Sequence, residues 1–327
     1  MSESASGQDQ FDPVTLEIFW SRLISIADES AAALLRTSFS TIVRESNDFG
    51  TVLMDANGDS LSENTGGIPS FSGILPRTLK HFLAKYPKET WKPGDCVITN
   101  DPWLATGHLP DITVAMPIFH DGTLVGFSGS IAHSPDIGGS LWSADCTELF
   151  EEGIRIPPIK FLKEGEPNED VVEMILGNVR LPEQVLGDLN AQVTANQVCG
   201  RRLNEFLDDS QLSDLSGLSR TLQGRAETAM RNAIEEVPDG VYRATLDADG
   251  FDEDETHIEC AVTVEGSDLT IDYTGTSKQI NRGLNTVMNY TYAYSAYPIK
   301  CAIDPYTPRN EGSYRPVKVT APEGTIL

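Results

Sequence analysis

The 327-residue sequence has no long apolar runs, few cysteines and few basic residues. No stretch approaches the roughly 20 consecutive apolar residues that a membrane-spanning helix requires, so we expect no membrane contact. The five cysteines are an odd number and form no C-x-x-C pair, which favours reduced thiols and a cytoplasmic location. Lysine and arginine number 24 against 49 aspartates and glutamates, a formal charge of −25. Such a chain repels phosphates, so we expect no nucleic-acid partner.

Phosphate-binding and hydrolase motifs are also lacking. The sequence has no G-x-x-x-x-G-K-[ST] loop, and residues 275–278 resemble one only in part, because the first glycine and the Gly-Lys pair are missing. Neither H-E-x-x-H nor G-x-S-x-G occurs. Any ATP that the activity uses must therefore bind elsewhere.

A strong hairpin signal is present at Asp121-Gly122. This pair lies between two apolar, strand-like runs, residues 112–119 and 124–131. A type I′ turn needs positive φ at both central positions, and Asp-Gly supplies it at low cost. The sequence therefore predicts two antiparallel strands joined by a two-residue turn.

The open end of this hairpin gathers histidines and carboxylates. With a two-residue loop, the numbers of paired residues sum to 243, which places Asp111 opposite Ala132. The same register brings His108, Asp111 and His133 together, with Asp136 just beyond. Two imidazoles and a carboxylate are typical ligands of a divalent transition metal. A polar loop cluster at a sheet end is the alternative interpretation.

Asp48 is a less obvious candidate ligand. It follows a helical pattern in the segment 44–50, Arg-Glu-Ser-Asn-Asp-Phe-Gly. A helix-terminating turn explains an aspartate there equally well, so the spacing alone leaves both roles open.

Hydrophobic periodicity predicts an α+β fold. Asp12-Pro13 is a favourable helix start, and helical spacing continues to about residue 44, in one helix or two. Helical spacing also fills residues 169–236, whereas strand patterns dominate from residue 241. We expect a disordered leader at 1–11, a metal-site α+β region with the hairpin at 12–165, a helical region at 166–237, and a β-rich region at 238–327 that is incomplete at its C-terminus.

Several motifs spread along the chain match those of one family. The matching segments are Arg44–Phe49, Asn100–Pro102, Gly107–Asp111, His133 with Asp136–Gly139, Glu152-Gly153, Arg155–Pro158, Asn178–Arg180, Gly187–Leu189 with Ala191-Gln192, Asp272–Ser277, and Asn310–Gly312 with Arg315-Pro316. They resemble the B subunits of the hydantoinase/5-oxoprolinase family, which also supplies a subunit to the ATP-dependent acetone and acetophenone carboxylases. Many members carry a second histidine where this chain has Ser134.

The resemblance implies an ATP-dependent hydrolase of cyclic amides with one divalent transition metal, Zn, Mn or Fe. It places the metal on Asp48, His108, Asp111 and His133. We expect Asp136 to act as a catalytic base or to orient His133. An actin-like ATPase A subunit is the expected partner and the user of ATP.

Two other functions remain open at this point. The chain can be the metal-binding subunit of an ATP-dependent ketone carboxylase, or a non-catalytic scaffold subunit with a structural metal. Family B subunits continue well beyond this sequence, so we also expect a C-terminal counterpart chain if the gene is split.

Overall fold

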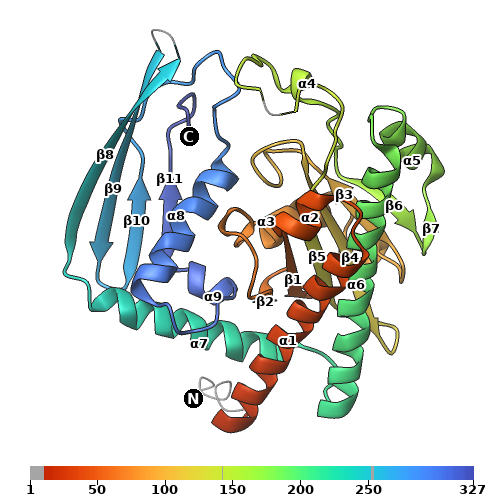
Figure 1. Cartoon of the computed structure of the whole chain (residues 1–327). Helices are drawn as coiled ribbons and strands as arrows, with labels where there is room; N and C mark the ends of the chain where they lie inside the picture. The colour runs from red at the N-terminus through yellow and green to blue at the C-terminus, as the bar shows by residue number, and fades with distance from the viewer. Residues whose placement is uncertain (1–10, 142, 252–253) are drawn as a thin grey trace.

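The chain folds into two β-sheets with helices packed around them, and the predicted α+β class is confirmed (Figure 1). The computed structural model describes residues 11–141, 143–251 and 254–327. The helices are α1 (Pro13–Thr37), α2 (Thr41–Ser46), η1 (Pro69–Phe71), α3 (Ile74–Lys85), η2 (Lys88–Thr90), α4 (Leu149–Glu152), α5 (Glu169–Leu176), α6 (Pro182–Ser210), α7 (Ser216–Glu235), α8 (Met288–Ile303) and α9 (Glu311–Tyr314). The strands are β1 (Phe49–Asp55), β2 (Ser60–Glu63), β3 (Cys96–Thr99), β4 (Asp111–His120), β5 (Thr123–His133), β6 (Ile159–Lys163), β7 (Glu166–Pro167), β8 (Gly240–Phe251), β9 (Asp254–Glu265), β10 (Asp268–Asp272) and β11 (Val317–Thr320).

The first helix begins where the sequence predicts. The Asp12 carboxylate accepts hydrogen bonds from the backbone N–H groups of Val14 and Thr15, both at 3.1 Å, and a proline follows it at the first helical position. Of the predicted leader, residues 1–10 lie outside the described part of the chain. The ring of Phe11 lies edge-on to that of Phe19, with centroids 5.8 Å apart.

The larger sheet has seven strands in the order β2-β1-β5-β4-β3-β6-β7, and all of its neighbours are antiparallel. Alternating side chains of β1 enter the cores on its two faces. Leu53 packs with α1 and α6, whereas Val52 and Met54 pack with α3 on the other face. Both faces are therefore covered, and the functional groups must lie at the ends of the strands. The sequence did not predict β6, which directly follows Pro157-Pro158.

The central hairpin forms, but its predicted register is wrong by one residue. Asp121 and Gly122 have φ values of 47° and 78°, as a type I′ turn requires. A β-bulge between Ile118 and Phe119 then shifts the pairing, so that Asp111 lies opposite His133 rather than Ala132. A bulge adds one unpaired residue to one strand, which a count from the turn does not include.

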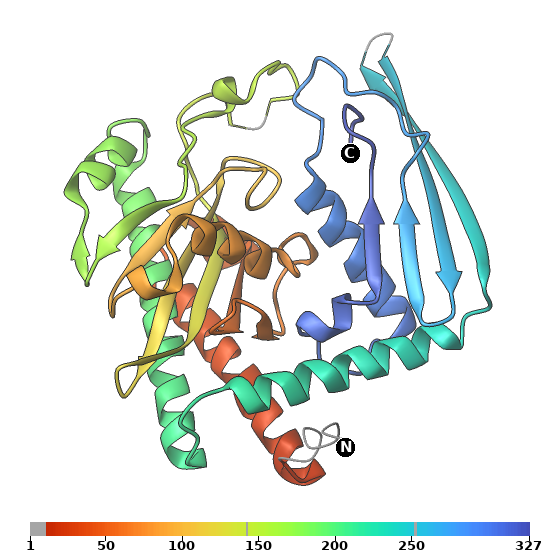
Figure 2. The same cartoon turned by 180° about the vertical axis from the view of Figure 1, so that it is seen from behind.

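The smaller sheet has the order β11-β10-β9-β8 and packs against α7 and α8 (Figure 2). Three of its strands run antiparallel, and β11 joins β10 in parallel. Between β10 and β11 the chain forms the 16-residue helix α8, which the sequence did not predict. Pro298 lies inside α8, and an internal proline normally breaks a helical pattern.

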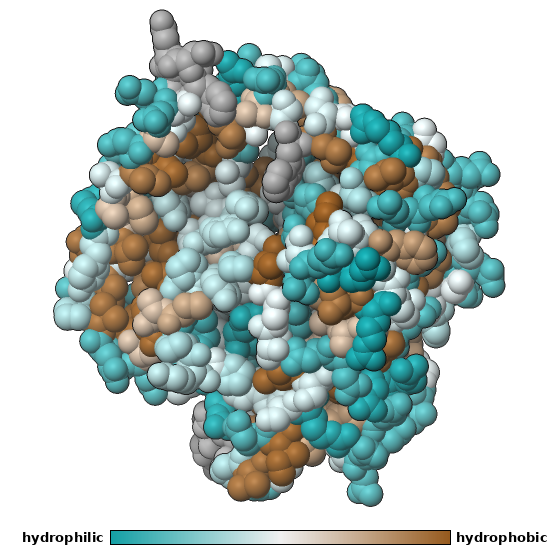
Figure 3. Space-filling model, viewed as in Figure 1, coloured by the Kyte–Doolittle hydropathy of each residue, from teal (hydrophilic) through white to brown (hydrophobic). Residues whose placement is uncertain are grey.

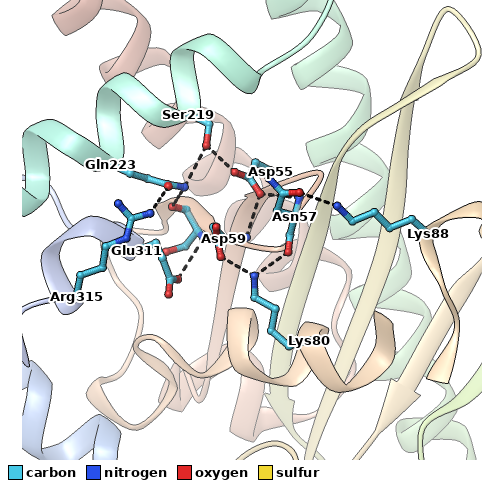
Figure 4. A network of polar contacts seen from close by, with 10 residues as sticks. Asp55, Asn57, Asp59, Lys80, Lys88, Ser219, Gln223, Glu311 and Arg315 are labelled. Carbon is cyan, nitrogen blue, oxygen red and sulfur yellow. Dashed lines mark hydrogen bonds and ion pairs between the residues drawn. The ribbon is translucent and has the colours of Figure 1, made fainter. Parts of the chain in front are cut away.

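A polar network joins the large sheet to helix α7 and to the segment after α9 (Figure 4). Ser219 of α7 donates a hydrogen bond to Asp55 Oδ2 at the end of β1, at 2.6 Å. Gln223, one turn further along α7, accepts a hydrogen bond of 2.7 Å from Arg315, which follows α9. Helix α7 runs beneath both sheets (Figure 1). The network therefore fixes the small sheet and α9 relative to the large sheet.

Apolar side chains are exposed along the outer side of the small sheet, where β8 and β9 lie (Figure 3). On β8 the exposed fractions are 53% for Val241 and 62% for Leu246. Among the described residues, no helix combines the length and apolar character needed to cross a membrane.

Candidate metal centre

Three neighbouring strands of the large sheet bring candidate ligands to one end. Asp111 is the first residue of β4 and His133 the last residue of β5, and they lie directly opposite each other. His133 Nδ1 is 3.1 Å from Asp111 Oδ1. The strand ends thus place one imidazole and one carboxylate in contact.

Asp48 reaches the same place from the other neighbour of β5. Helix α2 ends at Asn47, whose φ of 54° and ψ of 35° put it in the left-handed region, and the chain then turns into β1. The backbone N–H of His133 donates to the carbonyl of Asp48 at 3.1 Å. The Asp48 carboxylate lies 3.7 Å from His133 Nδ1. Asp48 is therefore both part of the helix-ending turn and close to the cluster.

His108 comes from the loop that precedes β4. Its Nε2 atom lies 3.0 Å from Asp111 Oδ1, and the two histidine rings are 5.0 Å apart between centroids. Asn100 holds this loop, because its side-chain amide donates to the carbonyls of Leu109 at 2.8 Å and Ile154 at 2.9 Å. The loop is thereby fixed to the segment that follows α4.

Burial and the two imidazoles control the charge of Asp111. Burial alone would raise the pKa of this carboxyl, but hydrogen bonds from His108 and His133 lower it below the ordinary value. Burial disfavours the charged form of His108, yet its hydrogen bond to Asp111 and the charge of Asp111 raise its pKa overall. Asp111 therefore stays ionised and orients both imidazoles.

The outer carboxylates behave differently. Burial raises the pKa of Asp48, and the nearby charge of Asp111 adds to the effect. Burial also raises the pKa of Glu152, whose Oε1 lies 3.9 Å from His108 Nδ1. The carboxylates of Asp48, Asp111 and Glu152 lie around the two imidazoles. Together they create a negative potential that favours a cation at this point.

The residues fit a divalent transition metal. One ligand atom each from His108, Asp111 and His133 lies within 4.8 Å of the others, and Asp48 borders this group. Imidazole nitrogens and carboxylate oxygens together are a typical donor set for such an ion. The side chains of His108 and Asp48 are 26% and 28% exposed, so the group can be reached from one side.

A cavity of about 590 Å³ opens beside His108 and Glu152. Its walls come largely from two parts of the chain far apart in the sequence, Leu141 with residues 143–149 and residues 279–287. Large apolar side chains in the lining are Trp103, Leu141, Leu149, Leu284 and Val287. A cavity of this size suits a small organic molecule.

Asp136, the predicted catalytic residue, lies in the loop after β5 and is almost fully buried. Its carboxylate accepts hydrogen bonds from the backbone N–H groups of Gly138 at 3.0 Å and Leu181 at 3.0 Å, and from the backbone and side chain of Arg180. Burial acts against ionisation, but these backbone donors lower the pKa of Asp136. The contacts tie the loop after His133 to the start of α6.

Several residues that shape the centre had no role predicted from the sequence. Glu152 accepts a hydrogen bond from the backbone N–H of Leu109 at 3.3 Å, directly after His108. Asp101 accepts one of 2.9 Å from Arg155 Nε, which braces the same loop. All of them stand in the motif segments Asn100–Pro102, Gly107–Asp111, Glu152-Gly153 and Arg155–Pro158, so the motifs were the only signal that pointed to them.

Comparison with known sequences places this geometry in a family. A family model described as hydantoinase B/oxoprolinase matches residues 12–327. The B component of a putative D-/L-hydantoinase from Pseudomonas sp. (strain NS671) is 32% identical, over 100% of this chain and 58% of that protein. The beta subunit of the caprolactamase from Pseudomonas jessenii is 30% identical, over 96% of this chain and 55% of that protein. The 5-oxoprolinase of Dictyostelium discoideum is 28% identical, over 97% of this chain and 26% of that protein.

Solved structures agree with the sequence comparison. The crystal structure of ATP-dependent caprolactamase from Pseudomonas jessenii matches with a TM-score of 0.89 at 30% identity, over 98% of this chain and 56% of that chain. A nucleotide-free structure of acetone carboxylase matches with a TM-score of 0.87 over 97% of this chain and 44% of that one; at 19% identity, it shows a shared fold. The chain spans little more than half the length of the first curated relatives. Motifs, family model and fold agree, and the chain belongs to the hydantoinase B/oxoprolinase family.

Proposed function

We propose that the chain is the metal-bearing B-type subunit of an ATP-dependent hydrolase of cyclic amides. The observation that carries this proposal is the convergence of Asp48, His108, Asp111 and His133 beside a substrate-sized cavity. The names of the relatives, hydantoinase, caprolactamase and 5-oxoprolinase, support a ring amide as the substrate.

In this proposal the four residues hold one divalent metal, Zn, Mn or Fe. When bound, such an ion supplies Lewis-acid chemistry that polarises a carbonyl oxygen and makes a water molecule more acidic. Asp111 Oδ1 lies 3.0 Å from Nε2 of His108 and 3.1 Å from Nδ1 of His133, so the three side chains converge on one point where such an ion would be held. Asp48 and His108 are the more exposed members and therefore face the incoming substrate.

Asp136 has a positioning role in this proposal. Donors surround its carboxylate, which favours holding the loop after His133 over accepting a proton from water. The apolar walls of the cavity take the hydrocarbon part of the ring and exclude bulk water. Water adds its oxygen to the amide carbon, the ring C–N bond breaks and the ring nitrogen takes up a proton. The oxygen that the partner has activated then leaves with its phosphoryl group when a second water molecule attacks the same carbon.

The proposed partner is an actin-like ATPase A subunit, which uses ATP to activate the amide oxygen as a leaving group. An unactivated amide is a poor electrophile, so the partner's step precedes attack by water. The names of the relatives support this division of labour, because two of them are single components of larger enzymes and one solved structure is called ATP-dependent.

The test uses the native assembly, purified with the proteins that remain bound to this chain. We expect ATP-dependent opening of hydantoin, 5-oxoproline or caprolactam, and loss of that activity in His108→Ala. Carboxylation of acetone or acetophenone with bicarbonate, without ring opening, would instead indicate the carboxylase function. Ring opening that persists in His108→Ala after loss of the metal would leave the ion a structural role.

A further inference from the structure

Helix α6, which packs on the large sheet, carries a buried polar stripe made by Asp188, Gln192 and Asn196 (Figure 1). These residues are four apart in the sequence, so they lie on one face of the helix. Buried polar groups cost free energy unless they are hydrogen-bonded. Asn196 finds its partners in β5, accepting from the hydroxyl of Ser128 at 2.7 Å and donating to that of Ser130 at 3.1 Å. Asp188 and Gln192 find theirs nearer to the metal centre.

Asp188 holds the beginning of α2. Its Oδ1 atom accepts hydrogen bonds from the backbone N–H groups of Phe39 at 2.7 Å and Ser40 at 3.1 Å. Ser40 is the N-cap of α2, and its hydroxyl accepts from the backbone N–H of Val43 at 3.3 Å. A helix of six residues is not stable by itself, so its position depends on such contacts with the rest of the fold. Asp48 follows the other end of α2, and Asp188 therefore determines where Asp48 lies.

Gln192 holds the two strands of the central hairpin. Its Nε2 atom donates to the backbone carbonyl of Ile112 at 2.9 Å, directly after Asp111. The same atom lies 3.4 Å from the carbonyl and 3.4 Å from the hydroxyl of Ser130, three residues before His133 on β5. Gln192 thus ties β4 and β5 to α6 at the end of the hairpin where the candidate ligands stand. Together with Asp188, it links one turn of α6 to the elements that carry three of the four candidate ligands.

We propose that Asp188 and Gln192 are positioning residues, which set the distances among Asp48, Asp111 and His133 and thereby the affinity of the centre for a metal ion. This inference rests on the proposed function. Bound metals require ligand distances within about 0.2 Å of their ideal values, so a small shift of one element weakens binding. The bonds of Asp188 go to backbone groups, as does the shortest bond of Gln192. Both residues therefore act through the elements that carry the ligands.

The test measures the dissociation constant for Zn²⁺ alone, by competition with a fluorescent chelator, in the native assembly freed of metal. Zn²⁺ is the probe because it binds such sites more tightly than Mn²⁺ or Fe²⁺. Asp188→Ala removes the acceptor and should weaken Zn²⁺ binding roughly tenfold or more, as does the loss of groups that hold metal ligands in place. Gln192→Met keeps the length of the side chain but removes the donor, and it should weaken binding to a similar extent.

Two control variants separate position from charge and from stability. Asp188→Asn loses the charge but keeps an acceptor oxygen, so its dissociation constant should stay within about threefold of wild type. Ser30 donates a buried hydrogen bond of 2.9 Å to the carbonyl of Ala195, also on α6. Ser30→Ala removes a buried contact of the same kind that involves none of α2, β4 or β5. It should lower Tm and leave the dissociation constant for Zn²⁺ unchanged.

Wild-type affinity for Zn²⁺ in a folded Asp188→Ala or Gln192→Met protein would overturn the inference. Equal weakening in Ser30→Ala would also overturn it, because loss of stability alone would then explain the effect. Equal weakening in Asp188→Asn would show that Asp188 acts by its charge and not by its contacts. Should Asp188→Ala fail to fold, Gln192→Met decides the matter. A wild-type assembly that binds no Zn²⁺ would instead refute the metal centre of the proposed function, and this inference would fall with it.

Discussion

At Gly312, the short helix α9 packs closely on the backbone of α7. A Cβ atom added there would lie 1.9 Å from the backbone oxygen of Gln223 and 2.7 Å from its carbonyl carbon, far inside the 3.4 Å at which ordinary contact begins. The obstacle is the backbone of α7, so no side-chain rotation can relieve the clash. Gly312→Ala must therefore push α9 away from α7.

This displacement has a calculable cost. Added methyl groups in well-packed cores cost about 1–3 kcal/mol, and a rigid helix backbone puts Gly312→Ala at the upper end of that range. Moving α9 also strains the hydrogen bond between Arg315 and Gln223. We expect Tm to fall by roughly 5–10 °C, from the usual few degrees per kcal/mol in large domains.

Differential scanning calorimetry at pH 7 provides the assay, and Gly224→Ala is its matched control. Gly224 follows Gln223 on α7, and an added Cβ there meets nothing within 4 Å. Alanine should therefore raise stability at that position by up to about 1 kcal/mol, through helix propensity. Equal shifts in the two variants, or a Tm for Gly312→Ala within 1 °C of wild type, would refute the packing argument.

Three further predictions concern charge and nucleotide. Arg309→Met should cost about 3–5 kcal/mol in the free energy of unfolding, because it leaves the buried Glu63 carboxylate without its partner at 2.6 Å; adding Glu63→Gln should recover most of the loss in urea titrations. Burial raises the pKa of Glu311, so its neutral form stabilises the fold below the unfolded pKa of about 4.3, and this contribution is lost as pH rises through the folded value. The Tm advantage of Glu311→Gln should thus grow from pH 4 to pH 7, and a constant advantage would contradict this. The purified chain without partners should hydrolyse no ATP, and steady phosphate release in a coupled assay would count against this prediction.

Local signals in the sequence predicted much of the fold. Asp12 and Pro13 marked the start of α1, and the change to strand patterns at residue 241 marked the beginning of the small sheet at β8. Each of these depends on neighbouring residues alone. The Asp121-Gly122 turn belongs to the same class, since its φ values follow from residue type.

The register of the hairpin and the position of α8 depend on distant contacts. The bulge beside Phe119 adds a residue that no turn signal reveals, and it moves His133 directly opposite Asp111. Pro298 concealed α8, and only the folded chain brings Tyr290 onto Gly107. Counting from the turn therefore predicted that His108, Asp111 and His133 lie together, but with the wrong residues paired across the strands.

Metal content per chain tests the central claim most directly. Elemental analysis of the purified native assembly should find one divalent transition metal per copy of this chain, and His108→Ala should retain less than a tenth of it at unchanged Tm. His120→Ala is the control, since His120 lies at the turn end of the same hairpin, beside Asp121 and Asp208. Its metal content should equal that of wild type. A folded His108→Ala protein with wild-type metal content would contradict the account.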